Sequence, residues 1–191
     1  MSDPIKPFAT IVDFITGRTV PNIGAEENRQ DLERYLVERQ GYGREDIEVE
    51  VPIEMDIAGE CYRSVVDLVA GAEGRRMVAF RCAAGSLGSC EREILAAARL
   101  LDRYQIPWAV ASDGRDAVVL DTVTGRRVGA GLAAVPGRAE LAAQLPGVEF
   151  KALPEDRRLR EQRIFRTYDR EGVNRACRLP SRSRRCLVIG L

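Results

Sequence analysis

The 191-residue sequence contains no histidine, and only two of its 29 basic side chains, Lys6 and Lys151, are lysines. The absence of histidine excludes serine–histidine and cysteine–histidine catalysis, and also metal sites that need imidazole ligands. Because no lysine lies between residues 7 and 150, mechanisms that need an ammonium group in the central part of the chain are excluded as well. Arginine supplies nearly all of the positive charge, and it almost never releases its proton.

Long apolar runs and paired cysteines are also missing from the sequence. No stretch approaches the roughly 20 apolar residues that span a bilayer, and the first residues lack the basic and apolar regions of a signal peptide. The five cysteines form no Cys-x-x-Cys pair, so neither a zinc site nor a disulfide scaffold is predicted. We therefore expect reduced thiols, a cytoplasmic protein and no association with membranes.

The overall composition is that of a globular protein, with 45% hydrophobic and 30% charged residues and a formal net charge of zero. It supplies apolar side chains for one core of roughly 150 residues and an appendage. We divide the chain into an N-terminal extension (1–21), a central domain (22–150) and a C-terminal basic helix and tail (151–191).

Hydrophobic periodicity predicts the order of the secondary-structure elements. Helices are expected at 24–40, 89–104 and 154–170 with a shorter one within 135–150, and strands at 47–53, 62–70, 75–82, 108–112 and 116–121. Asn22 or Gly24 is the candidate cap of the first helix. The first three strands should form an antiparallel meander, and the following helix should return the fourth strand parallel to the third. The predicted fold is α/β, an α/β/α sandwich around a mixed five-stranded sheet.

Positive charge is concentrated near the C-terminus, where eleven arginines and five acidic residues between 154 and 185 give a formal balance of +6. Such a segment suits a phosphate backbone or an acidic partner; the alternative is a solvated helix whose arginines pair with the rest of the protein. The apolar end, 186–191, is a candidate edge strand. The candidate nucleic-acid-binding residues are Arg157, Arg158, Arg163, Arg166, Arg182, Arg184 and Arg185.

Several short segments, taken in order over residues 22–125, resemble one known family. They are Ala25-Glu26-Glu27-Asn28-Arg29-Gln30, Ile47-Glu48-Val49-Glu50-Val51-Pro52-Ile53, Arg63-Ser64-Val65-Val66-Asp67-Leu68-Val69 and Ile106-Pro107-Trp108-Ala109-Val110-Ala111-Ser112-Asp113-Gly114-Arg115. Together they are similar to the N-terminal domain of type I restriction enzyme R subunits, which belongs to the PD-(D/E)xK, or restriction-endonuclease-like, superfamily. The resemblance implies the restriction-endonuclease-like version of the α/β/α sandwich and a prokaryotic restriction context.

The resemblance also implies a metal site. In such nucleases a helix Glu, a strand Asp and a Glu on the next strand bind Mg²⁺, and a Lys two residues later helps to activate water. Glu26 and Asp67 match the first two positions. The third strand reads Ala-Phe-Arg-Cys-Ala over 79–83, so Arg81 replaces the second metal carboxylate and Ala83 replaces the Lys. A guanidinium group at Arg81 should form an ion pair with Asp67 and fill the metal position.

We therefore expect a degenerate, catalytically inactive nuclease-like domain that needs no cofactor and acts as a DNA-binding or assembly module. The expected partners are DNA, restriction–modification subunits or a second copy of the chain. One alternative is an active Mg²⁺-dependent endonuclease in which Asp67 and Glu26 bind the metal with a migrated carboxylate such as Glu93. Another is a structural oligomer with no nucleic-acid role. As alternatives to a role in a site, Asp67 is a charge satisfied by Arg81, and Glu26 is a helix N-terminal charge.

Overall fold

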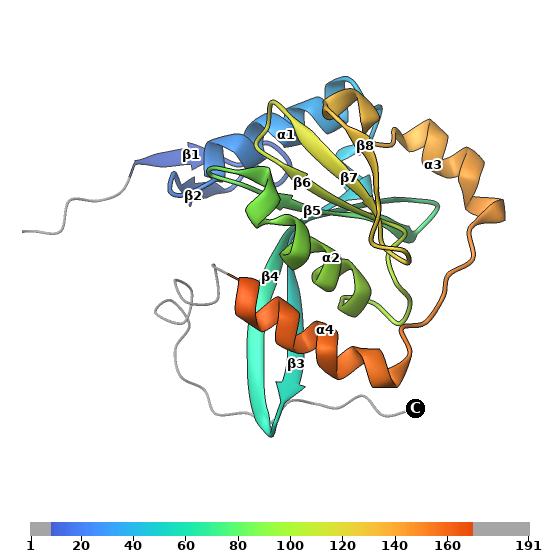
Figure 1. The fold of residues 1–191 in the computed structure, drawn as a ribbon. Helices are drawn as coiled ribbons and strands as arrows, with labels where there is room; N and C mark the ends of the chain where they lie inside the picture. The colour runs from blue at the N-terminus through green and yellow to red at the C-terminus, as the bar shows by residue number, and fades with distance from the viewer. Residues whose placement is uncertain (1–8, 170–191) are drawn as a thin grey trace, which may run out of the picture.

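The computed structural model describes residues 9–169, which form a six-stranded mixed sheet, a separate two-stranded sheet and helices on both faces of the larger sheet (Figure 1). The small sheet pairs β1 (Thr10–Val12) with β2 (Thr19–Pro21). The large sheet has the order β3-β4-β5-β6-β7-β8. Its strands are β3 (Ile47–Ile57), β4 (Glu60–Ala72), β5 (Arg75–Cys82), β6 (Trp108–Ser112), β7 (Ala117–Asp121) and β8 (Arg127–Ala130).

The large sheet divides the apolar core into two clusters, one on each of its faces, and helices cover both clusters. Leu36 of α1 (Glu26–Glu38) and Leu141 of α3 (Arg138–Gln144) belong to one buried cluster. Ile94 of α2 (Glu91–Leu100) and Phe165 of α4 (Glu155–Tyr168) belong to the other. Short 3₁₀ helices occupy Arg44–Asp46, Leu87–Ser89, Leu132–Ala134 and Leu145–Gly147. The α/β/α layering expected from the sequence is therefore present.

The predicted strand topology is confirmed, except for the number of strands. The strands β3, β4 and β5 form an antiparallel meander, and α2 then returns the chain so that β6 lies parallel to β5. The prediction of five strands was wrong, because β8 pairs with β7 at the edge of the sheet. Its four residues are mostly exposed and show no alternation of apolar and polar side chains. Backbone hydrogen bonds alone define this strand, and they leave no pattern in the sequence.

Two local predictions also need correction. The residue that precedes α1 is Ala25, which makes no side-chain capping hydrogen bond, and the Asn22 amide instead donates to Glu27. Cys82 and Cys90 are buried and form no disulfide, but Cys61 is disulfide-bonded, contrary to the expectation of reduced thiols throughout. Sequence spacing does not show which side chains meet in space. In the described part of the chain, no helix is long and apolar enough to cross a membrane.

The β3–β4 hairpin contributes to both apolar clusters and changes from one to the other at Asp67. Leu68 packs in the cluster beneath α1 and α3, whereas Val66 packs in the cluster beneath α2 and α4. On β3, between the register pairs Val49↔Leu68 and Val51↔Val66, Glu50 adopts φ 53°. This left-handed conformation is uncommon for a residue with a side chain. Asp67 lies beside this irregular part of β3, at the boundary between the two apolar clusters.

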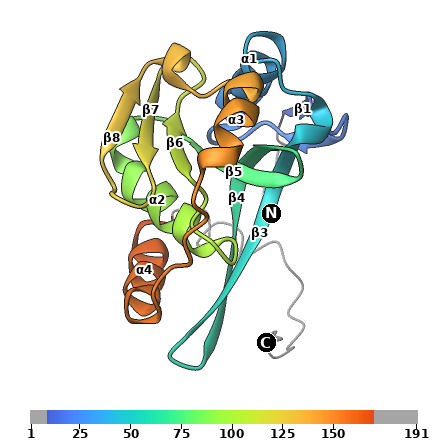
Figure 2. The same cartoon turned by 90° about the vertical axis from the view of Figure 1, so that its right-hand side faces the viewer.

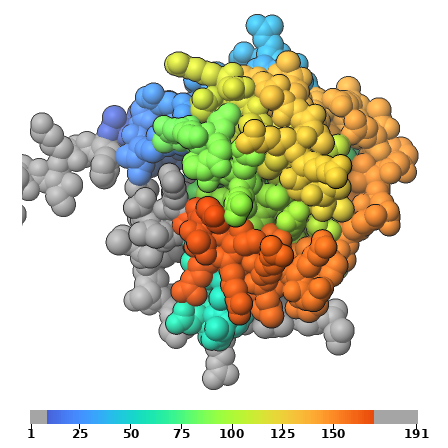
Figure 3. Space-filling model, viewed as in Figure 1, coloured from blue at the N-terminus to red at the C-terminus, as the bar shows by residue number. Residues whose placement is uncertain are grey.

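Helix α4 lies on the molecular surface beside α2 and the distal part of the β3–β4 hairpin (Figures 2 and 3). Its inner face carries Phe165, which is 1% exposed and packs edge-on against the ring of Tyr62 at a centroid distance of 6.4 Å. Its outer face carries Leu159, which is 57% exposed. The charged helix predicted at 154–170 is thus attached to the domain by an apolar contact.

We expect Phe165→Ala to lower the free energy of unfolding by about 3–5 kcal/mol, because it removes a buried ring and leaves a cavity. The matched change Leu159→Ala on the same helix should stay within about 0.5 kcal/mol. Urea denaturation followed by circular dichroism measures both. Equal effects of the two substitutions would show that α4 does not pack in this orientation.

Candidate functional site

The candidate site is centred on Asp67 and Arg81, which lie opposite each other on β4 and β5. The neighbouring register pair Leu68↔Phe80 places both side chains on the same face of the sheet. Arg81 Nη1 lies 2.9 Å from Asp67 Oδ1, and the backbone N–H of Cys82 donates to Asp67 Oδ2 at 2.6 Å. The expected ion pair is therefore present. Both residues are buried. The two hydrogen bonds engage both carboxylate oxygens of Asp67 within the protein.

Arg81 also contacts two acidic residues that come from helices. Its Nη2 atom lies 2.8 Å from Glu93 Oε1 on α2 and 3.8 Å from Oδ1 of Asp169, the residue after α4. The hydroxyl group of Tyr62 donates to the other Asp169 oxygen at 2.8 Å. Burial and this hydrogen bond raise the pKa of Tyr62, so its hydroxyl group remains a donor at neutral pH. Arg81 thus joins two strands, α2 and the end of α4.

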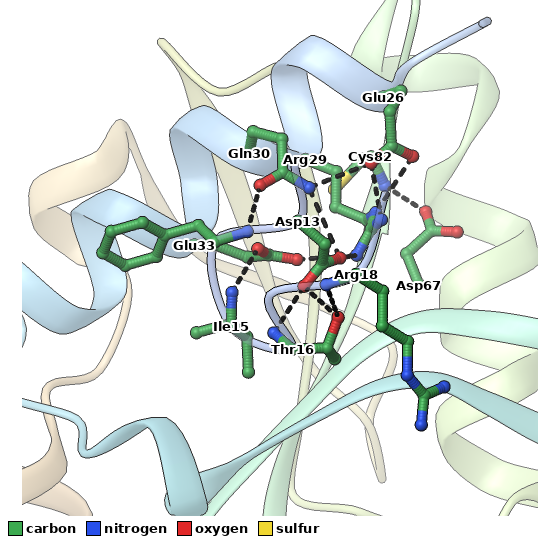
Figure 4. A network of polar contacts seen from close by, with 11 residues as sticks. Asp13, Ile15, Thr16, Arg18, Glu26, Arg29, Gln30, Glu33, Asp67 and Cys82 are labelled. Atoms are coloured by element: carbon green, nitrogen blue, oxygen red, sulfur yellow. Dashed lines mark hydrogen bonds and ion pairs between the residues drawn. The ribbon is translucent and has the colours of Figure 1, made fainter. Parts of the chain in front are cut away.

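Glu26 belongs to a polar network on α1 that is centred on Arg29 and lies near Asp67 and Cys82 (Figure 4). Arg29 Nη2 lies 2.5 Å from Glu26, and Arg29 Nη1 lies 2.7 Å from both Asp13 and Glu33. The Gln30 amide also donates to Glu26 at 2.9 Å. These contacts hold the carboxylate of Glu26 against Arg29 and Gln30, whereas the carboxylate of Asp67 is held by Arg81 and the Cys82 N–H.

The Arg29 network also attaches the N-terminal hairpin to α1. The backbone N–H groups of Phe14 and Ile15 donate to the side chains of Gln30 and Glu33 at 2.6 and 3.3 Å. Burial is the largest influence on Glu33 and raises its pKa to about 7, although the Arg29 guanidinium opposes this shift. Glu33 therefore changes its charge near neutral pH.

The thiol of Cys82 lies beside both networks. Burial raises the pKa of this thiol well above its ordinary value, and the nearby Asp67 carboxylate raises it further. Arg29 and Arg81 lower it but do not offset the burial. Cys82 is therefore a protonated, buried thiol, which makes it a poor nucleophile and a poor metal ligand.

Ala83, which the sequence resemblance aligns with the Lys of the nucleases, makes structural contacts. It is 3% exposed and its methyl group packs in the cluster beneath α2. Its backbone C=O accepts a 2.7 Å hydrogen bond from the Asn28 amide, and its N–H donates to Ser112 O at 2.7 Å. These bonds tie α1 and β6 to the end of β5, and the position supplies no amine.

These side chains do not fit a Mg²⁺ ion. A divalent cation needs several oxygen ligands around one point, but the guanidinium of Arg81 already lies between Asp67 and Glu93. Within residues 9–169, no group of three or more acidic, cysteine or histidine side chains is arranged to hold a metal. We therefore derive no hydrolytic step through a metal at this site.

Of the candidate nucleic-acid-binding arginines, Arg157, Arg158, Arg163 and Arg166 lie on α4, while Arg182, Arg184 and Arg185, like the candidate strand 186–191, lie outside the described residues. Arg166 is 3.3 Å from Glu60 and lies over the ring of Tyr62 at 5.7 Å. The other three form no ion pair with a described residue. The structure therefore leaves part of the basic helix available to an external anion, although DNA binding itself remains a prediction.

Sequence reasoning missed Asp13, Arg29, Glu33, Tyr62 and Asp169. Two of them carried a usable signal, since Arg29 follows Glu26 by three residues and precedes Glu33 by four, which are the spacings of paired side chains on a helix. Asp13, Tyr62 and Asp169 reach their partners through long-range contacts, for which the sequence has no local pattern.

The antiparallel meander, the parallel crossover and the helices on both faces define a mixed α/β domain that is consistent with a restriction-endonuclease-like fold. The family model for the type I restriction enzyme R protein N terminus matches residues 24–136, which is more than half of the chain. The chain belongs to this family. No curated protein and no solved structure matches it significantly.

The pKa of Glu33 predicts a pH dependence of stability. The unfolded carboxyl group ionises near pH 4.5, whereas the folded one keeps its proton until about pH 7. The contribution of Glu33 to stability is therefore complete below pH 4.5 and is lost as the pH rises to 7. We expect the wild type to lose free energy of unfolding relative to Glu33→Gln across this range.

Urea denaturation at several pH values measures the difference between the two proteins. The exposed change Glu38→Gln on the same helix is the matched control and should follow the wild type at every pH. A constant difference between wild type and Glu33→Gln would contradict the assigned titration.

Proposed function

We propose that this chain is a catalytically inactive PD-(D/E)xK-like domain, related to the R proteins of type I restriction enzymes, that binds DNA without cleaving it. The observation that carries the proposal is the buried ion pair between Arg81 and Asp67. Nuclease chemistry at this site would need an open carboxylate set and an amine, and the chain provides a guanidinium and a methyl group in those positions. The proposal places the protein with DNA and restriction–modification subunits in a prokaryotic cytoplasm.

The alternative of an active nuclease would require a migrated carboxylate to complete a metal site. Glu93 is the acidic residue of α2 that contacts the same guanidinium as Asp67, and its carboxylate lies 2.8 Å from Arg81. A divalent cation there would be repelled by the same guanidinium. This geometry favours the inactive domain over the migrated site.

Binding to DNA is supported by the arrangement of arginines on α4. Arg157 and Arg163 are exposed, and neither forms an ion pair with a described residue. Arginine side chains on an exposed helix can contact successive phosphates and release counterions, which makes the affinity depend on salt. Tyr168, which is 36% exposed and lies 5.9 Å beneath Arg92, adds an aromatic face at the end of this helix.

We expect the full-length chain to bind duplex DNA with an affinity that falls as salt increases. Arg163→Gln should weaken binding and reduce the slope of log affinity against log salt by about 0.9, the value for one lost phosphate contact. Arg39→Gln is the matched control, because Arg39 is exposed at the end of α1, on the opposite face of the sheet. Fluorescence anisotropy with a labelled duplex measures both.

Two results would overturn DNA binding by this helix. One is an absence of binding at low salt, and concentration-dependent self-association would then support the structural oligomer. The other is an equal loss of affinity in Arg163→Gln and Arg39→Gln.

Catalytic inactivity is tested separately with supercoiled plasmid in the presence of Mg²⁺ or Mn²⁺. We expect no nicking beyond that of the Asp67→Asn variant, because the wild-type site lacks an open metal position. Cleavage by the wild type that disappears in Asp67→Asn would establish the active nuclease and reject our proposal.

The relationship to nucleases predicts a gain of metal binding in the double variant Arg81→Glu/Ala83→Lys. The new carboxylate would lie beside Asp67 and Glu93, so Mn²⁺ should bind the variant more tightly than the wild type. Isothermal titration calorimetry measures the affinity, with the additional change Asp67→Asn as the control that removes one ligand. A folded double variant that binds Mn²⁺ no better than the wild type would contradict the inferred ancestry.

A further inference from the structure

Three acidic side chains from different parts of the fold meet around the guanidinium group of Arg81. Asp67 comes from β4, Glu93 from the first turn of α2, and Asp169 from the residue that follows α4. Asp67 is 8% exposed, Glu93 2% and Asp169 4%. We refer to these three residues as the Arg81 pocket. Buried carboxylates are costly without a cation, so their convergence needs a physical explanation.

The contacts match the shape of a guanidinium group. Asp67 lies against Nη1 and Glu93 against Nη2, at 2.9 and 2.8 Å, so two carboxylates bind two different nitrogen atoms of one planar group. A metal ion would instead require the oxygen atoms to converge on a single point at shorter distances.

Neighbouring groups fix the orientation of two of the three acidic residues. The Cys82 N–H holds the second oxygen of Asp67 at 2.6 Å, and the Tyr62 hydroxyl holds Asp169 at 2.8 Å. The carboxylates of Asp67 and Asp169 are therefore positioned by hydrogen bonds that do not involve Arg81. This is the property expected of a preformed binding pocket rather than of three acidic residues that follow a flexible arginine.

Asp169 gives the pocket a second role, because it directly follows the last residue of α4. The helix begins at Glu155 and packs through Phe165, and its far end is held at Asp169 by Tyr62 and, at 3.8 Å, by Arg81. A cation in the pocket thus connects the end of α4 to β4, β5 and α2.

We propose that Asp67, Glu93 and Asp169 form a guanidinium-binding pocket, which is filled by the chain's own Arg81 and fastens the end of α4 to the sheet. The nuclease-like site is in this view a structural cation site whose ligand is supplied by the protein. The inference concerns attachment of α4 and stands independently of DNA binding.

Chemical rescue of Arg81→Ala in the full-length chain tests the pocket. Removing Arg81 takes away a cation that contacts three buried carboxylates, so we expect the melting temperature to fall by roughly 10 °C. Millimolar methylguanidinium chloride should restore several degrees, whereas equal concentrations of NaCl or MnCl₂ should not. The wild type, whose pocket is filled, should respond to none of them.

The matched control is Arg76→Ala, which removes an arginine that pairs with Glu48 at 2.6 Å but is 31% exposed. This variant should lose at most about 3 °C and should show no rescue by methylguanidinium. Differential scanning fluorimetry measures all of these shifts.

Three results would overturn the proposal. They are a folded Arg81→Ala variant that methylguanidinium does not stabilise, an equal response of Arg76→Ala, and rescue by Mn²⁺ in place of methylguanidinium, which would indicate a metal pocket. If Arg81→Ala does not fold, Asp169→Asn replaces it. Hydrogen–deuterium exchange should then show faster exchange of the last turn of α4 and no change in α1; unchanged exchange at α4 would reject the proposed attachment.

Discussion

The ion pair between Asp67 and Arg81 is the interaction on which the arrangement of the site depends. It joins two central strands inside the protein, and the guanidinium reaches onward to α2 and to the end of α4. A buried carboxylate must be matched by a cation or by hydrogen-bond donors, because its desolvation is otherwise too costly. Asp67 has both, so each of its carboxylate oxygens is matched by a donor within the protein.

The backbone around Asp67 explains why such a charged residue lies in the interior. Val66, before Asp67, packs in one apolar cluster, and Leu68, after it, packs in the other. Glu50 on the neighbouring strand adopts a left-handed conformation. Asp67 therefore lies at the junction of the two apolar clusters and not in the middle of either one. The fold therefore places a buried polar cluster, with Asp67 and Arg81 at its centre, next to both apolar clusters.

A second arginine, on α1, repeats this pattern. Arg29 joins Asp13, Glu26 and Glu33 and thereby attaches the N-terminal hairpin to α1. Both networks use arginine as a fixed cation, which agrees with a sequence that has almost no lysine. Arginine keeps its charge when buried and offers several donors in a rigid plane, so it can hold several carboxylates at once. Glu26 is thereby paired with Arg29, and Asp67 with Arg81.

Local patterns were sufficient for most of the architecture. Alternation and helical spacing located the strands β3 to β7 and all four helices, and the order of these elements implied the meander and the parallel crossover. The ion pair of Arg81 with Asp67 also followed, because the family resemblance aligned their two strands. These features depend on short-range periodicity or on adjacent strands, which the sequence records directly.

Tertiary structure alone decided the rest. The sixth strand exists through backbone hydrogen bonds at a sheet edge, and its side chains show no strand pattern. Tyr62 and Asp169 are separated by 107 residues, and no local rule links them. Asp13 is likewise brought to Arg29 by a turn of the N-terminal hairpin. Long-range contacts of this kind form only when whole elements have packed together. The sequence was therefore sufficient to predict the pair of Arg81 and Asp67, whereas the residues that surround this pair were decided by the tertiary structure.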